Sequence, residues 1–495
     1  MTLANKKTAV STAHIKLNDP FLLKTDAYID GGWIKGAKRF NVTNPATGEL
    51  LAEVADLGAD ETTQAVEVAH KAWPQWRDMI ASDRANLLRR WYDLQLEHKD
   101  DLAMLMTCEQ GKPLAQAKGE VVYGANYTEW YAEESKRSYG DTMPSNDPDK
   151  RIVVIKQSVG VVGAITPWNF PHAMITRKIS PALAAGCTVV IKPSEETPLT
   201  ALALMELANR AGIPAGVINM ITTSDAKAVG GVLTSNPLVR KISFTGSTAV
   251  GKLLMKQSAD TVKKISLELG GNGAFIVFDD ANLENAAQDL CTLKFSNAGQ
   301  VCTNANRVYV QDGVYEAFTK LFKEKVAALK MGNGLQEATQ MGPVINQKAI
   351  DKIDSLVKDA VQDGAKVIHG GQVSDLGALF YLPTILADVT EKMRIRTEEI
   401  FGPVAPLYRF KTEEEVIAAA NDTPYGLANY LYSESVTRQW KVGEALESGI
   451  ISVNTTKYGA VQAPFGGYKE SGLGREGGKY GLEEFLETKF MMVQL

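Results

Sequence analysis

The sequence contains few cysteines and histidines for its length. Among 495 residues there are four cysteines (Cys108, Cys187, Cys291 and Cys302) and five histidines, and no two cysteines form a C-x-x-C pair. A disulfide framework or a zinc site needs more of these residues at closer spacing. We therefore expect no metal site, and reduced thiols of the kind found in cytoplasmic proteins.

Long apolar runs and an excess of positive charge are also missing. Residues 1–14 are polar, and the longest uncharged run, 157–176, is interrupted by Pro167, Asn169 and Pro171. Such segments are typical of neither a signal peptide nor a membrane span. Lys and Arg total 53 against 58 Asp and Glu, a formal net charge of −5, and the basic residues are scattered. We expect no nucleic-acid or membrane partner and a cytoplasmic location.

The pattern of apolar residues predicts an α/β protein of two or three domains. Helical periodicity covers three segments near the N-terminus: 60–76, 83–98 and 101–110, the last closed by Gly111. Short β-branched runs then alternate with helices: strands 159–165, 188–191, 217–221 and 242–245, with helices 199–211 and 250–258. A second series starts near residue 270: strands 274–278 and 307–310, with helices 283–297 and 315–330. Such alternation favours parallel, doubly wound sheets.

Cys302 is the candidate nucleophile. It follows a predicted helix that Gly299 ends, where backbone amides could stabilise a thiolate. The alternative is that a free cysteine is buried and inert. We assign that alternative to Cys108, Cys187 and Cys291, which lie within apolar helix or strand patterns.

Two polar residues at predicted strand ends could assist a nucleophile. Glu268 lies between leucines and before paired glycines, and apolar surroundings raise the pKa of a carboxyl group into the range of a general base. Asn169 lies between two prolines, where its amide could stabilise an oxyanion. Taken alone, Glu268 could equally be a paired structural charge.

Two further strand ends suggest a nucleotide site. Lys192 and Glu195 follow one strand directly, although a solvated loop would look the same. The segment 244–253 reads as a strand, a glycine turn and a helix start, which favours a phosphate at the helix terminus. It nearly spells a P-loop, but Leu253 stands where the hydroxyl that binds Mg²⁺ should be. A dinucleotide is therefore favoured over Mg-ATP.

Together these motifs resemble the aldehyde dehydrogenase superfamily. The resemblance rests on Phe-x-x-x-Gly-Gln-x-Cys ending at Cys302, Leu-Glu-Leu-Gly-Gly around Glu268, Pro-Trp-Asn-Phe-Pro around Asn169, and the segments 399–403 and 464–467. The motifs occur in the family's order over nearly the whole chain. The resemblance implies a Rossmann-type cofactor domain (1–139 and 158–269), a second α/β catalytic domain (270–480) and a β oligomerisation arm (140–157 and 481–495).

The same resemblance implies catalytic roles. Cys302 would attack an aldehyde, and Asn169 with the Cys302 backbone N–H would hold the oxyanion. After hydride transfer to a nicotinamide, Glu268 would activate the water that hydrolyses the thioester. Lys178 and Glu476 match positions proposed for a proton path.

Cofactor-binding residues are implied in the same way. Lys192 and Glu195 would hold the adenosine ribose, Ser247 the diphosphate, and Glu399 with Phe401 the nicotinamide end. The remaining matching positions are Thr166, Trp168, Ser194, Gly246 and Gly270. Because a carboxylate at Glu195 would repel a 2′-phosphate, we predict NAD in preference to NADP.

Within the superfamily the chain is most similar to succinate-semialdehyde dehydrogenases, through segments 109–114, 174–178 and 471–477. An anionic aldehyde is implied, with Arg177 clamping its carboxylate; the alternative for Arg177 is a structural salt bridge. Phe170, Ser296 and Phe465 would line the substrate tunnel. Ser296 stands where the subfamily usually has a second arginine, and Asn304 where it has a second cysteine, so no redox switch through a disulfide at Cys302 is expected. Gly459 replaces a frequent aromatic residue and predicts a wider pocket.

Succinate semialdehyde is the first candidate substrate, and the alternatives are glutarate or 2-oxoglutarate semialdehyde, sulfolactaldehyde, or a broad range of aldehydes. A cysteine esterase would need a neighbouring base such as His172, and a non-catalytic role would not need Cys302, Glu268 and Asn169 together. We expect a homotetramer assembled through the hairpin near 140–157 and a C-terminal strand near 490–495.

Overall fold

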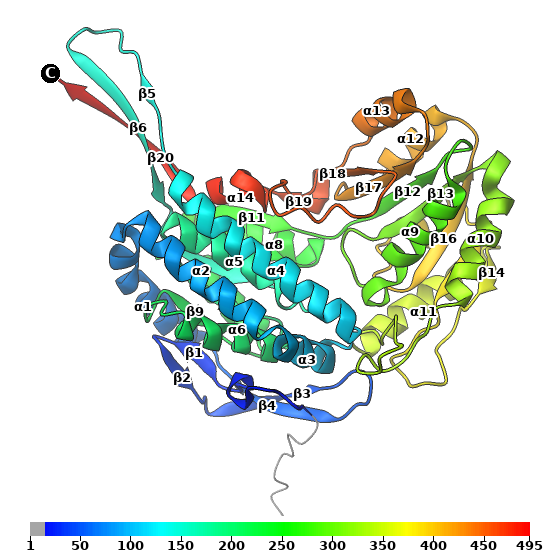
Figure 1. Cartoon of the computed structure of the whole chain (residues 1–495), viewed down its shortest axis with the longest axis horizontal. Coiled ribbons are helices and arrows are strands. Elements are labelled where there is room, and N and C mark those ends of the chain that lie inside the picture. The colour runs from blue at the N-terminus through cyan, green and yellow to red at the C-terminus, as the bar shows by residue number, and fades with distance from the viewer. Residues whose placement is uncertain (1–14) are drawn as a thin grey trace, which may run out of the picture.

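The computed structural model describes residues 15–495, and residues 1–14, for which no signal peptide is expected, lie outside the described residues. Two α/β halves lie side by side, and an arm extends from the first half (Figure 1). The first half contains most of the chain before residue 270, and the second contains most of the chain after it. The C-terminal strand runs out along the arm, so the C-terminus lies far from the second half.

The first half is built on an eight-stranded sheet. Its five central strands are parallel and almost wholly buried, as expected for continuous apolar runs, while the strands at its edges are antiparallel. In spatial order the strands are β19 (Gly472–Leu473), β11 (Lys264–Glu268), β10 (Val239–Thr245), β7 (Val161–Ile165), β8 (Thr188–Lys192), β9 (Ile218–Met220), β1 (Ala27–Ile29) and β2 (Gly32–Ile34). A separate two-stranded sheet is formed by β3 (Lys38–Thr43) and β4 (Leu50–Asp56).

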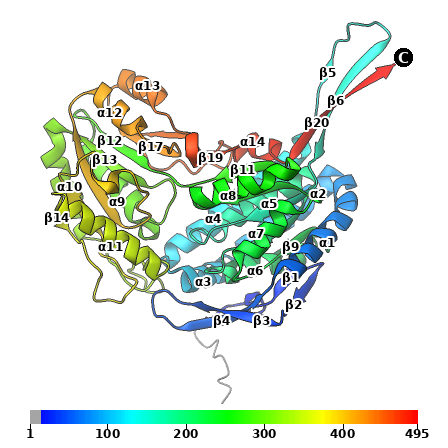
Figure 2. The same cartoon turned by 180° about the vertical axis from the view of Figure 1, so that it is seen from behind.

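Helices cover both faces of this sheet, which confirms the doubly wound pattern (Figures 1 and 2). One face packs against α1 (Ala59–Asp78), α7 (Ala226–Ser235) and α8 (Thr248–Ser258). The other packs against α5 (Ala173–Ala185) and α6 (Pro198–Arg210), with α2 (Ala81–Glu97), α3 (Lys99–Gln110), α4 (Leu114–Glu134) and α14 (Gly478–Glu483) outside them. Helix α4 was not predicted, although Pro113 at its start is a typical first-turn signal.

The second half is built on a seven-stranded sheet around its own core. In spatial order its strands are β14 (Lys366–His369), β15 (Thr384–Ala387), β16 (Val404–Phe410), β13 (Ala305–Gln311), β12 (Gly273–Val277), β17 (Ala428–Tyr432) and β18 (Ile450–Val453). Its helices are α9 (Leu283–Phe295), α10 (Tyr315–Ala327), α11 (Gln347–Gln362), α12 (Glu413–Asn421) and α13 (Val436–Ala445). Buried aromatic rings such as Phe275, Phe322 and Tyr430 fill this core.

The arm is a three-stranded antiparallel sheet of β5 (Thr142–Met143), β6 (Lys150–Ser158) and β20 (Leu486–Gln494). It projects away from both halves, so much of β20 is exposed (Figure 1). After β18 the chain returns to the first half, where β19 pairs with β11. The predicted limits of the domains stay a prediction, and this return favours placing residues 472–483 with the first half.

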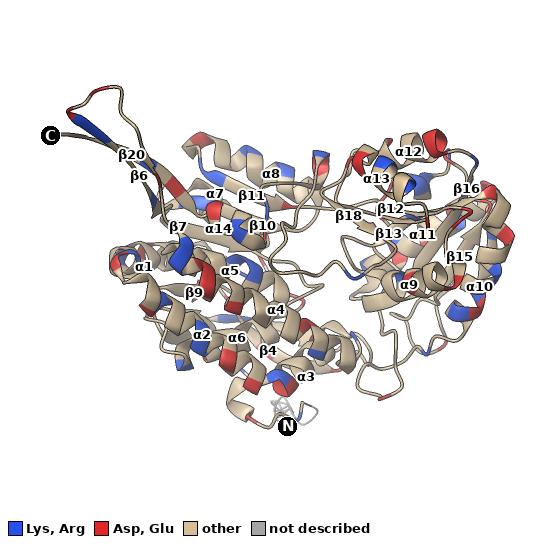
Figure 3. Ribbon diagram, turned by 45° about the horizontal axis from the view of Figure 1, so that its top comes forward, with Lys and Arg blue, Asp and Glu red and all other residues tan. Residues whose placement is uncertain are grey.

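Lys and Arg residues are interspersed with Asp and Glu residues along the ribbon of both halves (Figure 3). No helix among residues 15–495 combines the length and apolar character needed to cross a membrane. Within the same residues, no group of three or more His, Cys, Asp or Glu side chains is arranged to hold a metal ion.

Candidate active site

The loop that carries Cys302 is held in an unusual backbone conformation. Helix α9 ends at Phe295, earlier than the sequence predicted, because Asn297 and Ala298 adopt left-handed φ values of 50° and 54°. Gly299 follows with φ 78°, and a Cβ atom on it would lie 2.1 Å from the Gly402 carbonyl oxygen. The prediction that Gly299 ends the helix is therefore wrong, but a glycine is required there for close approach to the neighbouring loop.

Cys302 lies between two cavities. One, of about 340 Å³, is lined by Trp168, Gly246, Ser247, Gly270, Glu399 and Phe401 among others. The second, of about 520 Å³, is lined by Phe170, Arg177, Ser296 and Phe465 among others. Cys302 lines both cavities, so its partly exposed thiol faces the predicted cofactor residues on one side and the predicted substrate residues on the other.

The surroundings of Cys302 disfavour its thiolate form in this structure. Its enclosed position raises its pKa to about 12, and the nearby Arg177 charge opposes this shift only in part. The Cys302 backbone N–H lowers the pKa of the thiol, the direction expected from the sequence, but by less than burial raises it. Activation of Cys302 needs a base, or a change in its surroundings when ligands bind.

Asn169 lies at the end of the turn between β7 and α5 and is buried. Its side-chain Nδ2 donates a hydrogen bond to the Gln300 carbonyl at 3.0 Å, which places the amide beside the Cys302 loop. The carbonyl of Asn169 accepts hydrogen bonds from Lys112 Nζ at 2.8 Å and from Asn297 Nδ2 at 2.9 Å. Asn169 and Cys302 line the same cavity, as an oxyanion role would require.

Glu268 ends β11 and is 4% exposed. Burial raises its pKa well above the usual range of a carboxyl group, and the negative charge of Glu476 raises it further. Glu476 behaves in the opposite way: burial alone would raise its pKa, but Lys178 at 2.5 Å and Arg177 at 2.8 Å hold it below its ordinary value. The predicted pair of Lys178 and Glu476 is thus in contact, and Arg177 is in a salt bridge.

The cavity of about 340 Å³ contains the features expected of a nucleotide site. Ser247 caps α8 by accepting a hydrogen bond from the Val250 N–H at 3.4 Å, and Gly246 precedes it. A Cβ atom on Gly270 would lie 3.0 Å from Glu399 Oε2, so a larger residue there would press on the Glu399 carboxylate. Burial raises the pKa of Glu399, whose Oε1 accepts a hydrogen bond from the Gly271 N–H at 3.0 Å.

Two aromatic rings border this cavity. Trp168 and Phe401 meet edge to face, with ring centroids 5.6 Å apart, and Phe401 has a left-handed φ of 53°. This ring pair comes from the first and the second half of the chain respectively. Both rings therefore line the same cavity although they come from different halves.

The remaining predicted cofactor residues lie outside that cavity, at the ends of β7 and β8. The Thr166 N–H donates to the Lys192 carbonyl at 3.1 Å, and Ser194 is buried. Lys192 Nζ forms an ion pair with Glu195 Oε2 at 2.6 Å. The cation and carboxylate therefore do project at one sheet edge, but they are paired with each other.

The second cavity contains one buried and one exposed cation. Arg177 is 2% exposed and its guanidinium lies 3.9 Å from the centre of the Phe465 ring. Ser296 Oγ donates to Gln116 Oε1 at 3.3 Å. The exposed cation is Lys457, which the sequence did not single out and for which no carboxylate partner lies within salt-bridge distance among residues 15–495.

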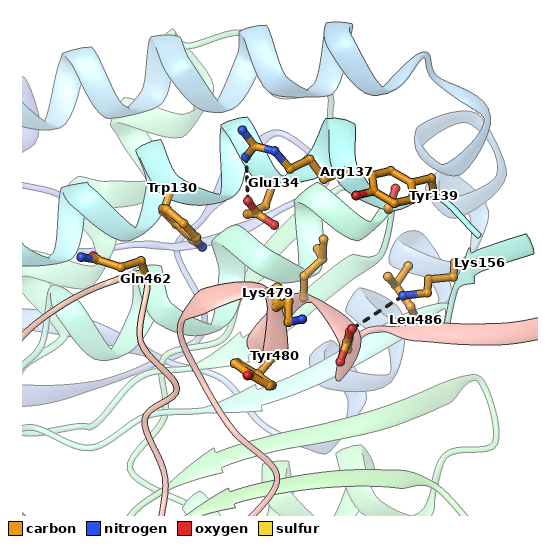
Figure 4. A pocket seen from close by; sticks show the side chains of 12 residues that line it. Trp130, Glu134, Arg137, Tyr139, Lys156, Gln462, Lys479, Tyr480 and Leu486 are labelled. Atoms are coloured by element: carbon orange, nitrogen blue, oxygen red, sulfur yellow. Dashed lines mark hydrogen bonds and ion pairs between the residues drawn. The ribbon is translucent and has the colours of Figure 1, made fainter. Parts of the chain in front are cut away.

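A third cavity, of about 480 Å³, lies at the root of the arm (Figure 4). Trp130, Glu134, Arg137 and Lys479 project from α4, the following turn and α14, and Lys156 and Leu486 belong to the arm. None of the predicted site residues lines it.

Comparisons with known proteins identify the fold and the motifs. The model of the aldehyde dehydrogenase family matches residues 33–491. The chain belongs to the aldehyde dehydrogenase family. It is 55% identical to an Escherichia coli succinate-semialdehyde dehydrogenase [NADP(+)], covering 97% of this chain and 100% of that one. A Pseudomonas aeruginosa glutarate-semialdehyde dehydrogenase is 55% identical, over 96% of this chain and 99% of that one.

A third relative and a solved structure are also similar to this chain. A Pseudomonas putida 3-sulfolactaldehyde dehydrogenase is 53% identical, over 96% of this chain and 98% of that one. A crystal structure described as an E. coli NADP-dependent enzyme has a TM-score of 0.96 at 55% identity, over 97% of this chain and 100% of that one. The aldehyde dehydrogenase fold predicted from the motifs is confirmed.

The prediction of NAD in preference to NADP is wrong. The E. coli relative and the solved E. coli structure are both described as NADP enzymes. The physical reason lies in Lys192, whose ammonium group is 2.6 Å from the Glu195 carboxylate and compensates its charge. A free Glu195 anion would repel a 2′-phosphate, but a carboxylate paired with a cation does not exclude one.

Proposed function

We propose that this aldehyde dehydrogenase oxidises an anionic semialdehyde, with succinate semialdehyde as the first candidate, to the corresponding acid with NADP⁺. The observation that carries the proposal is the position of Cys302, which lines both a cavity of cofactor-type residues and a cavity that contains Arg177 and Lys457. The relatives named for succinate semialdehyde, glutarate semialdehyde and 3-sulfolactaldehyde support an acidic substrate. Their substrates share an aldehyde at one end and an anionic group at the other.

The residues present fit a nicotinamide dinucleotide. The capped N-terminus of α8 offers N–H groups for a diphosphate, and Gly270 leaves room beside the partly buried Glu399 carboxylate. Lys192 and Ser194 at the end of β8 would face a ribose 2′-phosphate, the cation by charge and the hydroxyl by hydrogen bonding. When bound, the dinucleotide supplies the hydride acceptor.

In the proposed reaction Cys302 forms and then releases a covalent bond to the substrate carbon. When bound ligands have changed its surroundings, the Cys302 thiol gives its proton to solvent, Sγ adds to the aldehyde carbon, and Asn169 Nδ2 with the Cys302 N–H holds the oxyanion. Loss of hydride leaves a thioester on Cys302. Glu268 then takes a proton from water, which attacks the thioester and frees the acid and the thiolate. Because Cys302 must remain a free thiol, we place the enzyme in a reducing, cytoplasmic setting.

Glu268, Glu476 and Lys178 form the route by which a proton could leave the site. Glu476 is buried in contact with Lys178, and the pKa values of the two carboxyl groups shift in opposite directions. Where two neighbouring titratable groups have pKa values shifted in opposite directions, one commonly acts as the acid and the other as the base. We propose that Glu268 is the base and that Glu476 is ionised in the resting enzyme, so that it can accept the proton that leaves.

Recognition of the substrate's anionic group is assigned to two cations with different tasks. The Arg177 charge is already compensated by Glu476, so Arg177 forms the inner wall and tunes Cys302 and Glu268. Among residues 15–495 no carboxylate lies within salt-bridge distance of Lys457, which is exposed at the same cavity, so its charge can attract a carboxylate or sulfonate. Phe170, Phe465 and Ser296 complete the wall, and Gly459 leaves space next to Tyr123.

The test is NADPH formation at 340 nm with succinate and glutarate semialdehydes, sulfolactaldehyde, butanal and aminobutanal. We expect kcat/KM for the anionic aldehydes to exceed that for butanal by about tenfold or more, since one charge pair in a partly buried site is worth ~1.4 kcal/mol or more. Lys457→Met should raise KM for the anionic aldehydes about three- to tenfold and leave butanal unchanged, whereas Arg177→Ala should lower kcat for every aldehyde. Lys392→Met, which removes an exposed lysine elsewhere, is the control. Equal turnover of butanal and the anionic aldehydes would refute the substrate class.

We also propose that the enzyme is a homotetramer assembled through the arm. Strand β20 exposes large apolar side chains on both of its faces, Phe490, Met491, Met492 and Val493, and Leu495 follows it. Monomers rarely expose so many neighbouring apolar side chains, which favours contact with other copies. The position of the arm away from both halves leaves it free to reach a second copy (Figure 1).

A further inference from the structure

We propose that the buried ion pair of Lys112 and Glu120 positions the Asn169–Phe170 turn for catalysis. The two side chains are 1% and 2% exposed and in contact with each other. Lys112 follows α3 in the Gly111–Pro113 turn, and Glu120 lies in the second turn of α4, so the pair ties the α3–α4 turn to α4. This inference rests on the proposed function, because it concerns the residue assigned to hold the oxyanion.

Both partners direct their remaining hydrogen bonds to one turn. Lys112 Nζ donates to the Asn169 carbonyl at 2.8 Å and lies 4.1 Å from the centre of the Phe170 ring. Glu120 Oε1 accepts from the His172 N–H at 3.0 Å and from the Ala173 N–H at 3.2 Å. The pair therefore binds the turn at two places: at the Asn169 carbonyl, and three residues later at the N–H groups at the start of α5.

The contacts of the pair match a positioning role better than a contribution to stability alone. A buried ion pair gains little over an apolar pair of similar size, because both charges lose their hydration. Burial lowers the pKa of Lys112, and the Glu120 charge opposes this shift. Such a pair can form charge-assisted hydrogen bonds to backbone carbonyl and N–H groups, which apolar side chains cannot form, and so fixes the position of the turn.

The same carbonyl links the turn to the Cys302 loop. Asn297 Nδ2 donates to it at 2.9 Å, and Asn297 Oδ1 accepts from Gln110 Nε2 at 2.8 Å. Asn169 is thus tied through its backbone to Lys112 and Asn297, and through its side chain to Gln300. The direction of the Asn169 amide toward Cys302 depends on these ties.

A small cavity gives the turn room to move if the pair is lost. It measures about 270 Å³ and is lined by Lys112, Gln116, Glu120, Tyr123, Phe170 and Ser296 among others. Lys112 and Glu120 line neither cavity that contains Cys302. They therefore act on the reaction through Asn169 and Phe170, without touching the reacting atoms.

The test compares Lys112→Met with the double variant Lys112→Met/Glu120→Gln, which leaves no unpaired buried charge and so protects the fold. The matched control is Lys118→Met. Lys118 lies on α4, as Glu120 does, but forms an exposed ion pair with Asp100 at 3.0 Å. We expect the pre-steady-state burst of NADPH to slow about 10- to 100-fold in Lys112→Met and in the double variant. An oxyanion donor contributes about 10²–10³-fold to the rate, and a misplaced donor loses much of this contribution. The control should keep the wild-type burst, and circular dichroism should show folded protein throughout.

A double-mutant cycle with Asn169→Ala separates positioning from general damage. If the pair acts through Asn169, its removal in the Asn169→Ala background should slow the burst less than about twofold. The same fold loss in both backgrounds, or a wild-type burst in the double variant, would overturn the inference. The cycle is measured with whichever aldehyde of the panel the wild type oxidises fastest, so a wrong substrate class would leave this result intact.

Discussion

Cys302 and Glu268 are two acidic groups that both lie near Arg177, and both have raised pKa values. Neither group ionises easily in this structure, although the reaction needs each of them without its proton at some step. The Arg177 and Lys178 charges lower the pKa of Glu268, while the Glu476 charge raises it. The charge balance around these residues therefore decides the pH at which the site works.

Replacing Glu268 by Gln should separate the two half-reactions. Gln cannot accept a proton from water, so the thioester on Cys302 should form and then persist. We expect a burst of about one NADPH per site followed by steady turnover lowered about 10²–10⁴-fold, the usual contribution of a general base. Stopped-flow absorbance and intact-protein mass after quenching check both parts. Cys302→Ala, which should give neither burst nor acyl-enzyme but still bind NADP⁺, is the control.

Replacing Glu476 by Gln should move the acid limb of the pH–kcat profile to lower pH. Glu268 must be deprotonated to act, so kcat falls as pH drops through its raised pKa. Removing the Glu476 charge lowers the pKa of Glu268 and leaves Lys178 and Arg177 uncompensated, which lowers it further. We expect a shift on the order of one pH unit.

The measurement is kcat with saturating aldehyde from about pH 5 to pH 10, because a raised carboxyl pKa titrates within that range. Glu134→Gln is the control, because Glu134 is also a buried carboxyl group paired with Arg137 but lies at the root of the arm. An acid limb that stays in place or moves upward in Glu476→Gln would contradict the assigned charge balance.

At the scale of elements, the Cys302 loop depends on backbone shapes that few side chains allow. Gly299→Ala would force a left-handed alanine and bring Cβ within 2.1 Å of the Gly402 carbonyl oxygen. We expect a loss of about 2 kcal/mol or more of stability, together with a fall in kcat, because the loop and the strand that follows Gly402 must both shift. Thermal unfolding and steady-state rates measure the two effects.

Gly313→Ala is the matched control, since no atom lies within 4 Å of a Cβ atom at that position. Wild-type kcat and thermal stability in Gly299→Ala would show that the loop tolerates both the φ angle and the contact. A loss of stability without a loss of kcat would show that Cys302 keeps its position when the loop moves.

The sequence predicted those parts of the fold and site that depend on local pattern. Strands β7, β8 and β10 and the glycine turn before α8 follow from apolar runs and helix-start signals, and Glu268 was correctly placed at a buried strand end. The helix before Cys302 was predicted too long, because no residue type announces left-handed backbone at Asn297 and Ala298.

Contacts between distant segments were beyond local pattern. Lys112 and Asn169 are 57 residues apart, and only the packing of α4 against α5 brings them together. Lys192 and Glu195 are close in sequence, yet residue types alone do not say that their charges pair. Lys457 lies on a loop without periodicity, where sequence gives no sign that it borders the cavity.

At the scale of the whole molecule, the arm holds an exposed apolar strand away from both halves. In a single copy this strand would be covered by water, whereas in an assembly another copy would cover it. Met491→Asp/Val493→Asp introduces two charges on one face of β20, and burying these against another copy would be costly. We expect the molar mass in light scattering to fall from about 215 kDa, four copies of 53.7 kDa, to a smaller assembly or a monomer.

Val436→Asp/Trp440→Asp is the control for that experiment, because these side chains are 64% and 68% exposed on α13, remote from the arm. It adds the same two charges at exposed apolar positions and should keep the wild-type mass. A wild-type protein that scatters as a monomer would rule out the tetramer at once. A tetramer that persists with both charges on β20 would show instead that the copies meet through another surface, and the apolar side chains of the arm would then need a different explanation.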